Sequence, residues 1–176
     1  AGPLLTRNVK LMSAWGANAI SVAEFACAQI LLAGKEYFQN QRDAKIPGRW
    51  AAGQVSRGRG NYGARVALLG LGQVGRETLA RLRNSRLELL VVDPFLSSEA
   101  TREFGATKVE LPEAFATANV VSNHLPLLPA TRQMLGKELF ASMPNGATFI
   151  NTARGATVNE PEMIDVLAAR PDLTAL

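Results

Sequence analysis

The chain has 176 residues, of which 47% are hydrophobic and 19% charged, and its formal net charge is +4. This composition is typical of one globular domain, and such a modest, dispersed positive charge does not favour nucleic acid as a partner. The single cysteine excludes an internal disulfide. With no signal-peptide pattern and no uncharged apolar run of about 18 residues, we expect a cytoplasmic protein without a membrane span.

A long apolar helix is predicted ahead of the first strand. Residues 1–18 are expected to form an irregular lead-in, followed by a helix over residues 19–41. Ser21 and Glu24 have the spacing of a capping box, which places the N-cap at Ser21. The first half of the helix, which includes Cys27, is apolar on nearly every side and is therefore expected to be buried. Such a surface suits a domain or subunit contact.

Residues 42–64 combine lysines and arginines with several glycines. This pattern is typical of a solvated surface loop. A short irregular hairpin and an anion-binding patch are the alternatives to a plain loop.

A glycine-rich turn follows the first predicted strand. Residues 66–70 are an apolar run without polar alternation, as expected of a strand that is buried on both faces. Glycines at 70, 72 and 75 give the pattern G-x-G-x-x-G, and a helix is predicted from about Gln73. In this pattern Gly70 permits the turn, Gly72 leaves room for a pyrophosphate, and Gly75 lets the helix lie close to the strand.

Asp93 ends the next apolar run, residues 87–92. A dinucleotide site places the acid that binds the adenine ribose about 20 residues beyond the glycines, close to this position. Strand, glycine turn, helix and acid together predict dinucleotide binding. A carboxylate here argues against NADP, because it would repel the 2′-phosphate.

The rest of the chain alternates predicted strands with predicted helices. The expected strands cover residues 107–109, 119–124, 146–151 and 173–176, and the expected helices cover 97–104, 111 onwards, 131 onwards with 137–141, and 159–169. This alternation predicts an α/β fold with a doubly wound parallel sheet of the Rossmann type over residues 65–176, preceded by the extra N-terminal helix. We expect residues 1–176 to form one NAD-binding domain.

Four stretches resemble the D-isomer-specific 2-hydroxyacid dehydrogenases, namely residues 18–24, residues 70–75 with Asp93, residues 124–131 and residues 150–155. The resemblance implies an NAD-dependent oxidoreductase that acts on a small D-2-hydroxy acid or 2-oxo acid. It also implies a homodimer that packs through the helix ahead of the first strand. The family's common Arg-Ile after the second glycine is Gln73-Val74 here, which changes side chains near the pyrophosphate but leaves the backbone cradle intact.

The resemblance further implies which residues bind cofactor and substrate. Arg154 holds the place of the arginine that binds the substrate carboxylate and polarises the neighbouring carbonyl, a task that suits a guanidinium fork. No metal site is expected. The implied cofactor-binding residues are Gly70, Gly72, Gln73, Val74, Gly75, Asp93, Leu125, Pro126, Thr131, Thr152, Ala153 and Arg154.

His124 is the only histidine of the chain. By the resemblance it is a structural or cofactor-side residue, since the family's acid/base histidine and the glutamate that orients it lie after the sixth strand. The sequence ends at Leu176, ahead of that segment. We therefore expect this chain to bind NAD without turnover.

Two other functions fit parts of the sequence. The first is a corepressor-like interaction protein of the same fold that senses NAD(H), which turnover by the full-length protein would exclude. The second is a Rossmann domain that binds NADP or a methyl donor, and Asp93 argues against NADP.

Overall fold

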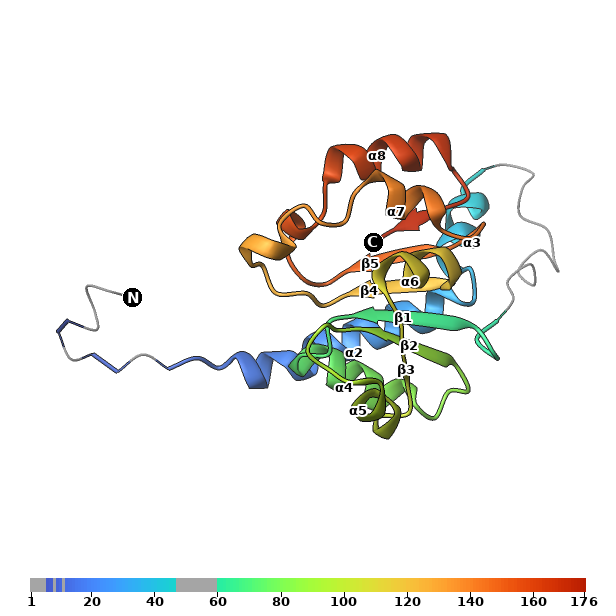
Figure 1. Ribbon diagram of the computed structural model, residues 1–176. Helices are drawn as coiled ribbons and strands as arrows, with labels where there is room; N and C mark the ends of the chain where they lie inside the picture. The colour runs from blue at the N-terminus through green and yellow to red at the C-terminus, as the bar shows by residue number, and fades with distance from the viewer. Residues whose placement is uncertain (1–5, 8, 11, 47–59) are drawn as a thin grey trace.

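The computed structural model describes residues 6–7, 9–10, 12–46 and 60–176. Within these residues the centre is a six-stranded parallel sheet in the order β3-β2-β1-β4-β5-β6, with helices on both faces (Figure 1). The strands are β1 (Arg65–Leu69), β2 (Glu88–Val92), β3 (Thr107–Lys108), β4 (Val120–Asn123), β5 (Thr148–Asn151) and β6 (Thr174–Ala175). The helices are α2 (Trp15–Ala33), α3 (Tyr37–Ala44), α4 (Gln73–Leu82), α5 (Ser98–Glu103), α6 (Leu111–Thr117), α7 (Lys137–Ser142) and α8 (Glu160–Ala169).

Strand β1 lies in the middle of the sheet and is apolar on both faces. Val66 and Leu68 belong to the core that includes residues of α2 and α4. Ala67 and Leu69 belong to the second core, which includes residues of α6, α7 and α8. Because helices cover both faces, the strand shows no polar alternation. The predicted doubly wound sheet with an additional N-terminal helix is confirmed.

The strand order reverses at β1, which pairs with β2 on one side and β4 on the other. In open parallel sheets, ligands bind beyond the carboxyl ends of the strands at such a reversal, because the connections on either side run to opposite faces and leave a crevice. The carboxyl end of β1 carries the glycine turn, and those of β4 and β5 carry residues 124–127 and 152–154.

The prediction for the first helix was wrong at both ends. Helix α2 begins at Trp15 without a side-chain cap, and Ser21 lies inside it. The Ser21 hydroxyl donates to the Asn18 carbonyl oxygen at 3.1 Å, three residues back, so a serine that resembled a cap is satisfied within the helix. The helix ends at Ala33, and Glu36, with a left-handed φ of 52°, separates it from α3.

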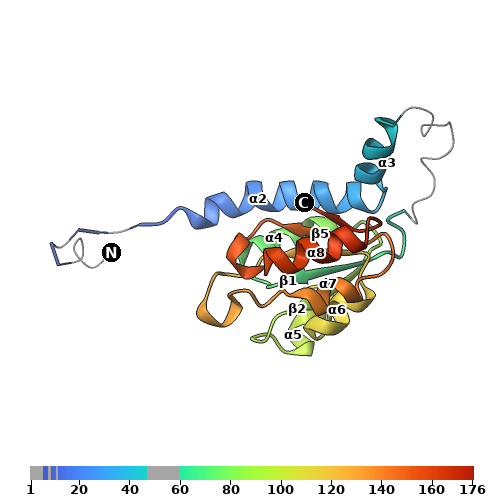
Figure 2. The same ribbon diagram turned by 90° about the horizontal axis from the view of Figure 1, so that it is seen from above.

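Burial of the first helix is one-sided. Ala19, Ala23, Ala26, Ile30 and Ala33 are buried, and α2 packs chiefly on α4. Phe25 is 57% and Leu32 36% exposed, so in this chain by itself the predicted burial holds for one face of the helix only. Figure 2 shows α2 running along one side of the domain. Among the described residues, it is the one helix whose length and apolar composition would suffice to cross a membrane.

Two connecting segments also differ from expectation. No α-helix starts at Thr131: a 3₁₀ turn covers Pro129–Thr131, and Leu135 forms an isolated parallel bridge with Val158 before α7 begins. Of the predicted loop 42–64, residues 42–44 belong to α3, and residues 47–59, with any anion-binding patch there, lie outside the described residues.

Candidate functional site

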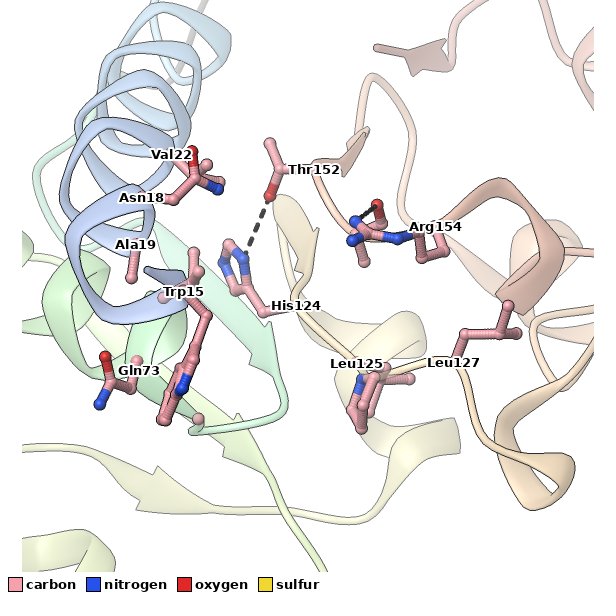
Figure 3. Close-up of a pocket in the computed structure, with 14 residues that line it drawn as sticks. Trp15, Asn18, Ala19, Val22, Gln73, His124, Leu125, Leu127, Thr152 and Arg154 are labelled. Carbon is pink, nitrogen blue, oxygen red and sulfur yellow. Dashed lines mark hydrogen bonds between the residues drawn. The ribbon is translucent and has the colours of Figure 1, made fainter. Parts of the chain in front are cut away.

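A cleft of about 490 Å³ opens at the carboxyl ends of the central strands. Its walls are the first turns of α2 and α4 and the loops that follow β4 and β5 (Figure 3). Eight of the residues predicted for the site line it: Gly72, Gln73, Val74, Leu125, Pro126, Thr152, Ala153 and Arg154. The fold therefore joins three stretches that lie apart in the sequence, residues 72–74, 125–126 and 152–154.

The glycine turn forms one wall of this cleft. Gly70 has a positive φ of 86°, and a Cβ there would lie 3.3 Å from the His124 carbonyl oxygen. A Cβ at Gly75 would overlap the Gly70 carbonyl oxygen, because α4 starts directly against the end of β1. A Cβ at Gly72 would meet no atom within 4 Å and would stand in open space where Gly72 lines the cleft.

This open space suits a pyrophosphate. The first N–H groups of a helix have no partner within the helix, and they carry its positive dipole end. Helix α4 starts at Gln73, directly after Gly72, so its free N–H groups lie at the cleft. The cradle therefore fits a dinucleotide phosphate bound by backbone atoms, as expected from the glycine spacing.

Asp93 lies on the other side of the glycine turn, at the end of β2, and does not line the cleft. One carboxylate oxygen accepts the Leu71 N–H at 2.9 Å and the other accepts the Phe95 N–H at 2.9 Å. Each ionised oxygen has a further lone pair, so both can still accept a ribose hydroxyl. A dinucleotide that crosses the end of β1 would place its adenosine half over β2 and its nicotinamide half in the cleft.

Arg154 stands at the far wall from the glycine turn (Figure 3). Its side chain is exposed, and the guanidinium donates to the carbonyl of Ala153 at 3.1 Å. The 3₁₀ turn Gly155–Thr157 follows directly, and Thr157 Oγ1 donates to the Arg154 carbonyl at 2.8 Å. The backbone of Arg154 is thus held by Thr157, and its side chain lines the cleft.

His124 directly follows β4, and each nitrogen of its imidazole ring lies next to a hydroxyl group. Ser122 Oγ is 3.0 Å from Nε2, and Thr152 Oγ1 is 3.2 Å from Nδ1. The ring keeps some contact with solvent through the cleft, but protein atoms surround it closely, and this desolvation lowers its pKa from 6.5 to about 4. The imidazole is neutral at pH 7, and both nitrogens have partners, as expected of a structural residue.

The structure adds cleft residues that the sequence did not single out, and four residues predicted for the site do not line the cleft: Gly70, Gly75, Asp93 and Thr131. Helix α2 contributes its first two turns, through Trp15, Asn18, Ala19 and Val22. The stretch 18–24 carries part of the family resemblance, which was the available signal. Thr131 does not line the cleft. Its hydroxyl accepts the Leu128 N–H at 2.9 Å and donates to the Pro126 carbonyl at 2.6 Å, closing its own loop.

Comparison with known sequences gives one family. Residues 27–175 match the family model of the D-isomer specific 2-hydroxyacid dehydrogenase, NAD binding domain. The D-3-phosphoglycerate dehydrogenase of Archaeoglobus fulgidus is 31% identical over 163 residues, which are 93% of this chain and 31% of the relative. The chain therefore spans about a third of the length of the curated relatives it matches.

Solved structures agree with this result. The NAD⁺-bound 3-phosphoglycerate dehydrogenase of Entamoeba histolytica superposes with a TM-score of 0.71 at 26% identity, over 91% of this chain and 46% of that one. The holo form of D-mandelate dehydrogenase from Rhodotorula graminis has a TM-score of 0.81 over 98% of this chain and 52% of that one. At 23% identity it supports the fold alone. Because the family model covers most of the chain, the chain belongs to the D-isomer-specific 2-hydroxyacid dehydrogenase family and carries that family's NAD-binding domain.

Proposed function

We propose that this chain is the cofactor domain of an oxidoreductase that transfers a hydride between NAD(H) and C2 of a D-2-hydroxy acid or its 2-oxo form. One observation carries the proposal: Arg154 and the glycine turn face one cleft from opposite walls. An anionic substrate held by Arg154 would lie next to the nicotinamide half of the cofactor. Two reactants that are bound side by side do not have to meet by diffusion, and alignment of this kind can lower the activation free energy by about 7–11 kcal/mol.

The residues of the cleft, together with Asp93 beside it, divide the binding of cofactor and substrate by charge. The N-terminus of α4 and the bare backbone at Gly72 bind the pyrophosphate, and Asp93 binds the adenine ribose. Arg154 binds the substrate carboxylate bidentately and polarises the adjacent oxygen. When bound, NAD supplies the carbon that accepts or donates the hydride.

His124 does not act as the proton donor in this proposal. It is the only described cleft-lining residue that ordinarily titrates near neutrality, and its lowered pKa keeps it without a proton at pH 7. A general acid works best with a pKa near the working pH. The 176-residue chain by itself should therefore bind NAD and leave pyruvate, glyoxylate and hydroxypyruvate unreduced.

An absorbance assay at 340 nm tests the placement of these roles. The 176-residue chain should show no NADH oxidation with the three 2-oxo acids, whereas the full-length protein should reduce a 2-oxo acid and lose this activity in Arg154→Ala. Turnover by the short chain that disappears in His124→Asn would place the acid/base at His124 and refute the assignment. A full-length protein that binds NAD but turns over no 2-hydroxy acid would favour the NAD(H)-sensing alternative.

Cofactor choice is tested through Asp93. Calorimetry should show tighter binding of NAD than of NADP, and Asp93→Ala should weaken NAD by about 1–3 kcal/mol. Asp93→Asn is the matched control, because one amide oxygen can still accept the Leu71 N–H that the aspartate holds. It should relax discrimination against NADP while disturbing the turn less. Equal affinity of the unsubstituted chain for both cofactors would contradict the role of Asp93.

We further propose a homodimer that packs through α2. Its residues Ser21, Phe25, Ala28 and Leu32 are exposed and recur every three or four positions, so they form a single stripe on the side away from the sheet. An isologous contact needs only one such self-complementary surface. Light scattering at micromolar concentration should give a dimer for the chain and a monomer for Phe25→Arg. A monomeric unsubstituted chain would refute this interface.

The proposed location is the cytoplasm. Cys27 is a free, half-buried thiol on α2, and burial raises its pKa, although Arg81 opposes this shift. Such a thiol is a poor nucleophile, which supports a core role and suits a reducing compartment. Fractionation of the source cells, with the protein in the soluble cytoplasmic fraction, is the expected result, and recovery with membranes would contradict it.

A further inference from the structure

Asn123, the last residue of β4, is a polar side chain with no exposure to solvent. Its amide nitrogen donates to Asn151 Oδ1 at 3.1 Å and to Thr157 Oγ1 at 2.9 Å, and its amide oxygen accepts the Leu125 N–H at 3.1 Å. A backbone N–H can only donate, so its partner must be the amide oxygen, and this fixes the orientation of the group. Both hydrogens of the amide nitrogen and its oxygen are therefore used.

The sheet register explains why the two asparagines meet. Strands β4 and β5 are parallel, and Asn123 pairs with Asn151 at their last rung. Side chains of paired residues project to the same face of a sheet. The meeting therefore occurs at the carboxyl edge, where the two strands enter the loops that line the cleft.

The two side chains that accept from Asn123 hold the backbone next to Arg154. Asn151 Oδ1 also accepts the Ala153 N–H at 3.1 Å. Thr157 Oγ1, which accepts from Asn123, donates its own proton to the Arg154 carbonyl at 2.8 Å. Asn123 thus links the loop that begins at Leu125 to both sides of Arg154 through two short hydrogen-bond chains.

We propose that Asn123 is a positioning residue that sets the place of Arg154 relative to the nicotinamide half of the cleft, an inference that rests on the proposed function. The Arg154 side chain is exposed and has a long, flexible stem, so only its backbone can be fixed in advance. The Asn123 network fixes that backbone from within the fold. An apolar residue at 123 could fill the same volume but would release Leu125, Asn151 and Thr157 together.

A purely structural role makes a different prediction. A buried hydrogen-bonding group that only stabilises the fold would, when removed, lower protection against hydrogen exchange throughout the domain. A positioning residue should loosen residues 153–154 selectively and weaken carboxylate binding more than cofactor binding. None of the hydrogen bonds of this network involves Gly72 or Asp93, which bind the pyrophosphate and the adenine ribose in the proposed function, so NAD affinity is the internal reference.

Four variants separate the two roles. Asn123→Leu removes the three hydrogen bonds of the Asn123 amide. Thr157→Val removes one hydroxyl with little change of shape and remains informative if Asn123→Leu folds poorly. Thr157→Ser keeps the hydroxyl and is the conservative rescue. Val121→Ala, two residues earlier on the same face of β4 and fully buried, lowers stability without touching the network.

The readouts are amide hydrogen exchange by NMR, NADH affinity by calorimetry, and binding of oxamate, a 2-oxo acid mimic, to the NADH complex by fluorescence. Asn123→Leu and Thr157→Val should speed exchange at Ala153 at least tenfold more than at Leu68 of β1, and should weaken oxamate at least tenfold. NADH affinity should stay within threefold. Thr157→Ser should match the unsubstituted chain, and Val121→Ala should change Ala153 and Leu68 alike.

The outcomes that refute the two proposals differ. Unchanged exchange at Ala153 in both network variants, or exchange that rises equally across the sheet, would overturn the positioning role whatever Arg154 binds. An equal loss of NADH and oxamate affinity would overturn it too, because the network would then serve the cofactor. An unsubstituted chain that binds NADH but no oxamate would contradict the carboxylate role of Arg154 and hence the proposed function.

Discussion

Alanine at Gly72 and alanine at Gly75 should have opposite consequences. At Gly75 the new methyl group would overlap the Gly70 carbonyl oxygen, which cannot move easily because the Gly70 N–H is bonded to Val92 at 2.8 Å. Overpacking of this kind costs about 1–3 kcal/mol. Alanine gains up to about 1 kcal/mol over glycine in a helix. We therefore expect a net loss of about 1–2 kcal/mol of unfolding free energy, or about 2–8 °C in Tm.

At Gly72 the balance is reversed. The residue has φ −70° and ψ −161°, which any L-residue adopts, and a Cβ there meets no atom within 4 Å. Gly72 is the N-cap of α4, where alanine is less favourable than glycine, so stability should fall by about 0.5–1 kcal/mol, less than at Gly75. The methyl group would instead occupy the space assigned to the pyrophosphate, so NAD affinity should fall at least tenfold, about 1.4 kcal/mol.

Thermal unfolding and NAD calorimetry on the two variants decide the matter together. Gly72→Ala should bind NAD poorly and unfold at a temperature nearer to that of the unsubstituted chain, and Gly75→Ala should unfold at a lower temperature. Gly72→Ala with normal NAD affinity would refute the phosphate cradle at this turn. A Gly75→Ala variant of undiminished stability would refute the close approach of α4 to β1.

Two further predictions concern pH and the far end of the sheet. The unfolded His124 takes up its proton near pH 6.5 and the folded residue near 4, so the folded state should lose up to about 3 kcal/mol as the pH falls through this range. Urea unfolding between pH 7 and 4.5 measures this loss. If the unfolding free energy of His124→Gln depended on pH as steeply as that of the unsubstituted chain, the lowered pKa of His124 would be refuted as the cause. Arg170 binds both carboxylate oxygens of Asp172, at 2.9 and 2.7 Å, and its hydrogen bond lowers the pKa of Asp172 from 3.8 to about 2. Stability from this pair should be lost as the pH falls from 3.8 to 2. Arg170→Lys should lower the unfolding free energy by about 1 kcal/mol or less in urea unfolding at neutral pH, and it should leave NAD binding intact. A change in NAD affinity would contradict a role confined to that end of the sheet.

The glycine turn of the candidate site could be predicted because backbone geometry specifies it. A glycine is required wherever the chain turns sharply, as at Gly70, or two elements touch, as at Gly75, and both needs are visible as single letters at fixed spacing. The strands were predictable for a similar reason. Runs such as residues 66–69 are apolar without alternation because helices cover both faces of the sheet.

The limits of α2 could not be predicted in the same way. Ser21 and Glu24 satisfy the pattern of a capping box, but the helix had already begun at Trp15, so the serine bonds within it. Local pattern also cannot show that one apolar face packs on α4 while the other, with Phe25, stays exposed. That division depends on where the sheet lies, and it brings Trp15 to the cleft.

The wall of the cleft that carries Arg154 depends on side chains that meet only in the fold. In the sequence Asn123 is one polar residue in a predicted strand, and Asn151 and Thr157 lie 28 and 34 residues further on. No spacing rule relates them, because the separation is set by the length of the connection between two parallel strands. Once the register pairs Asn123 with Asn151, a buried amide at that rung must find three partners or destabilise the fold. It finds them on both loops of the cleft, so satisfying a buried polar group and fixing the backbone of Arg154 are achieved by the same hydrogen bonds.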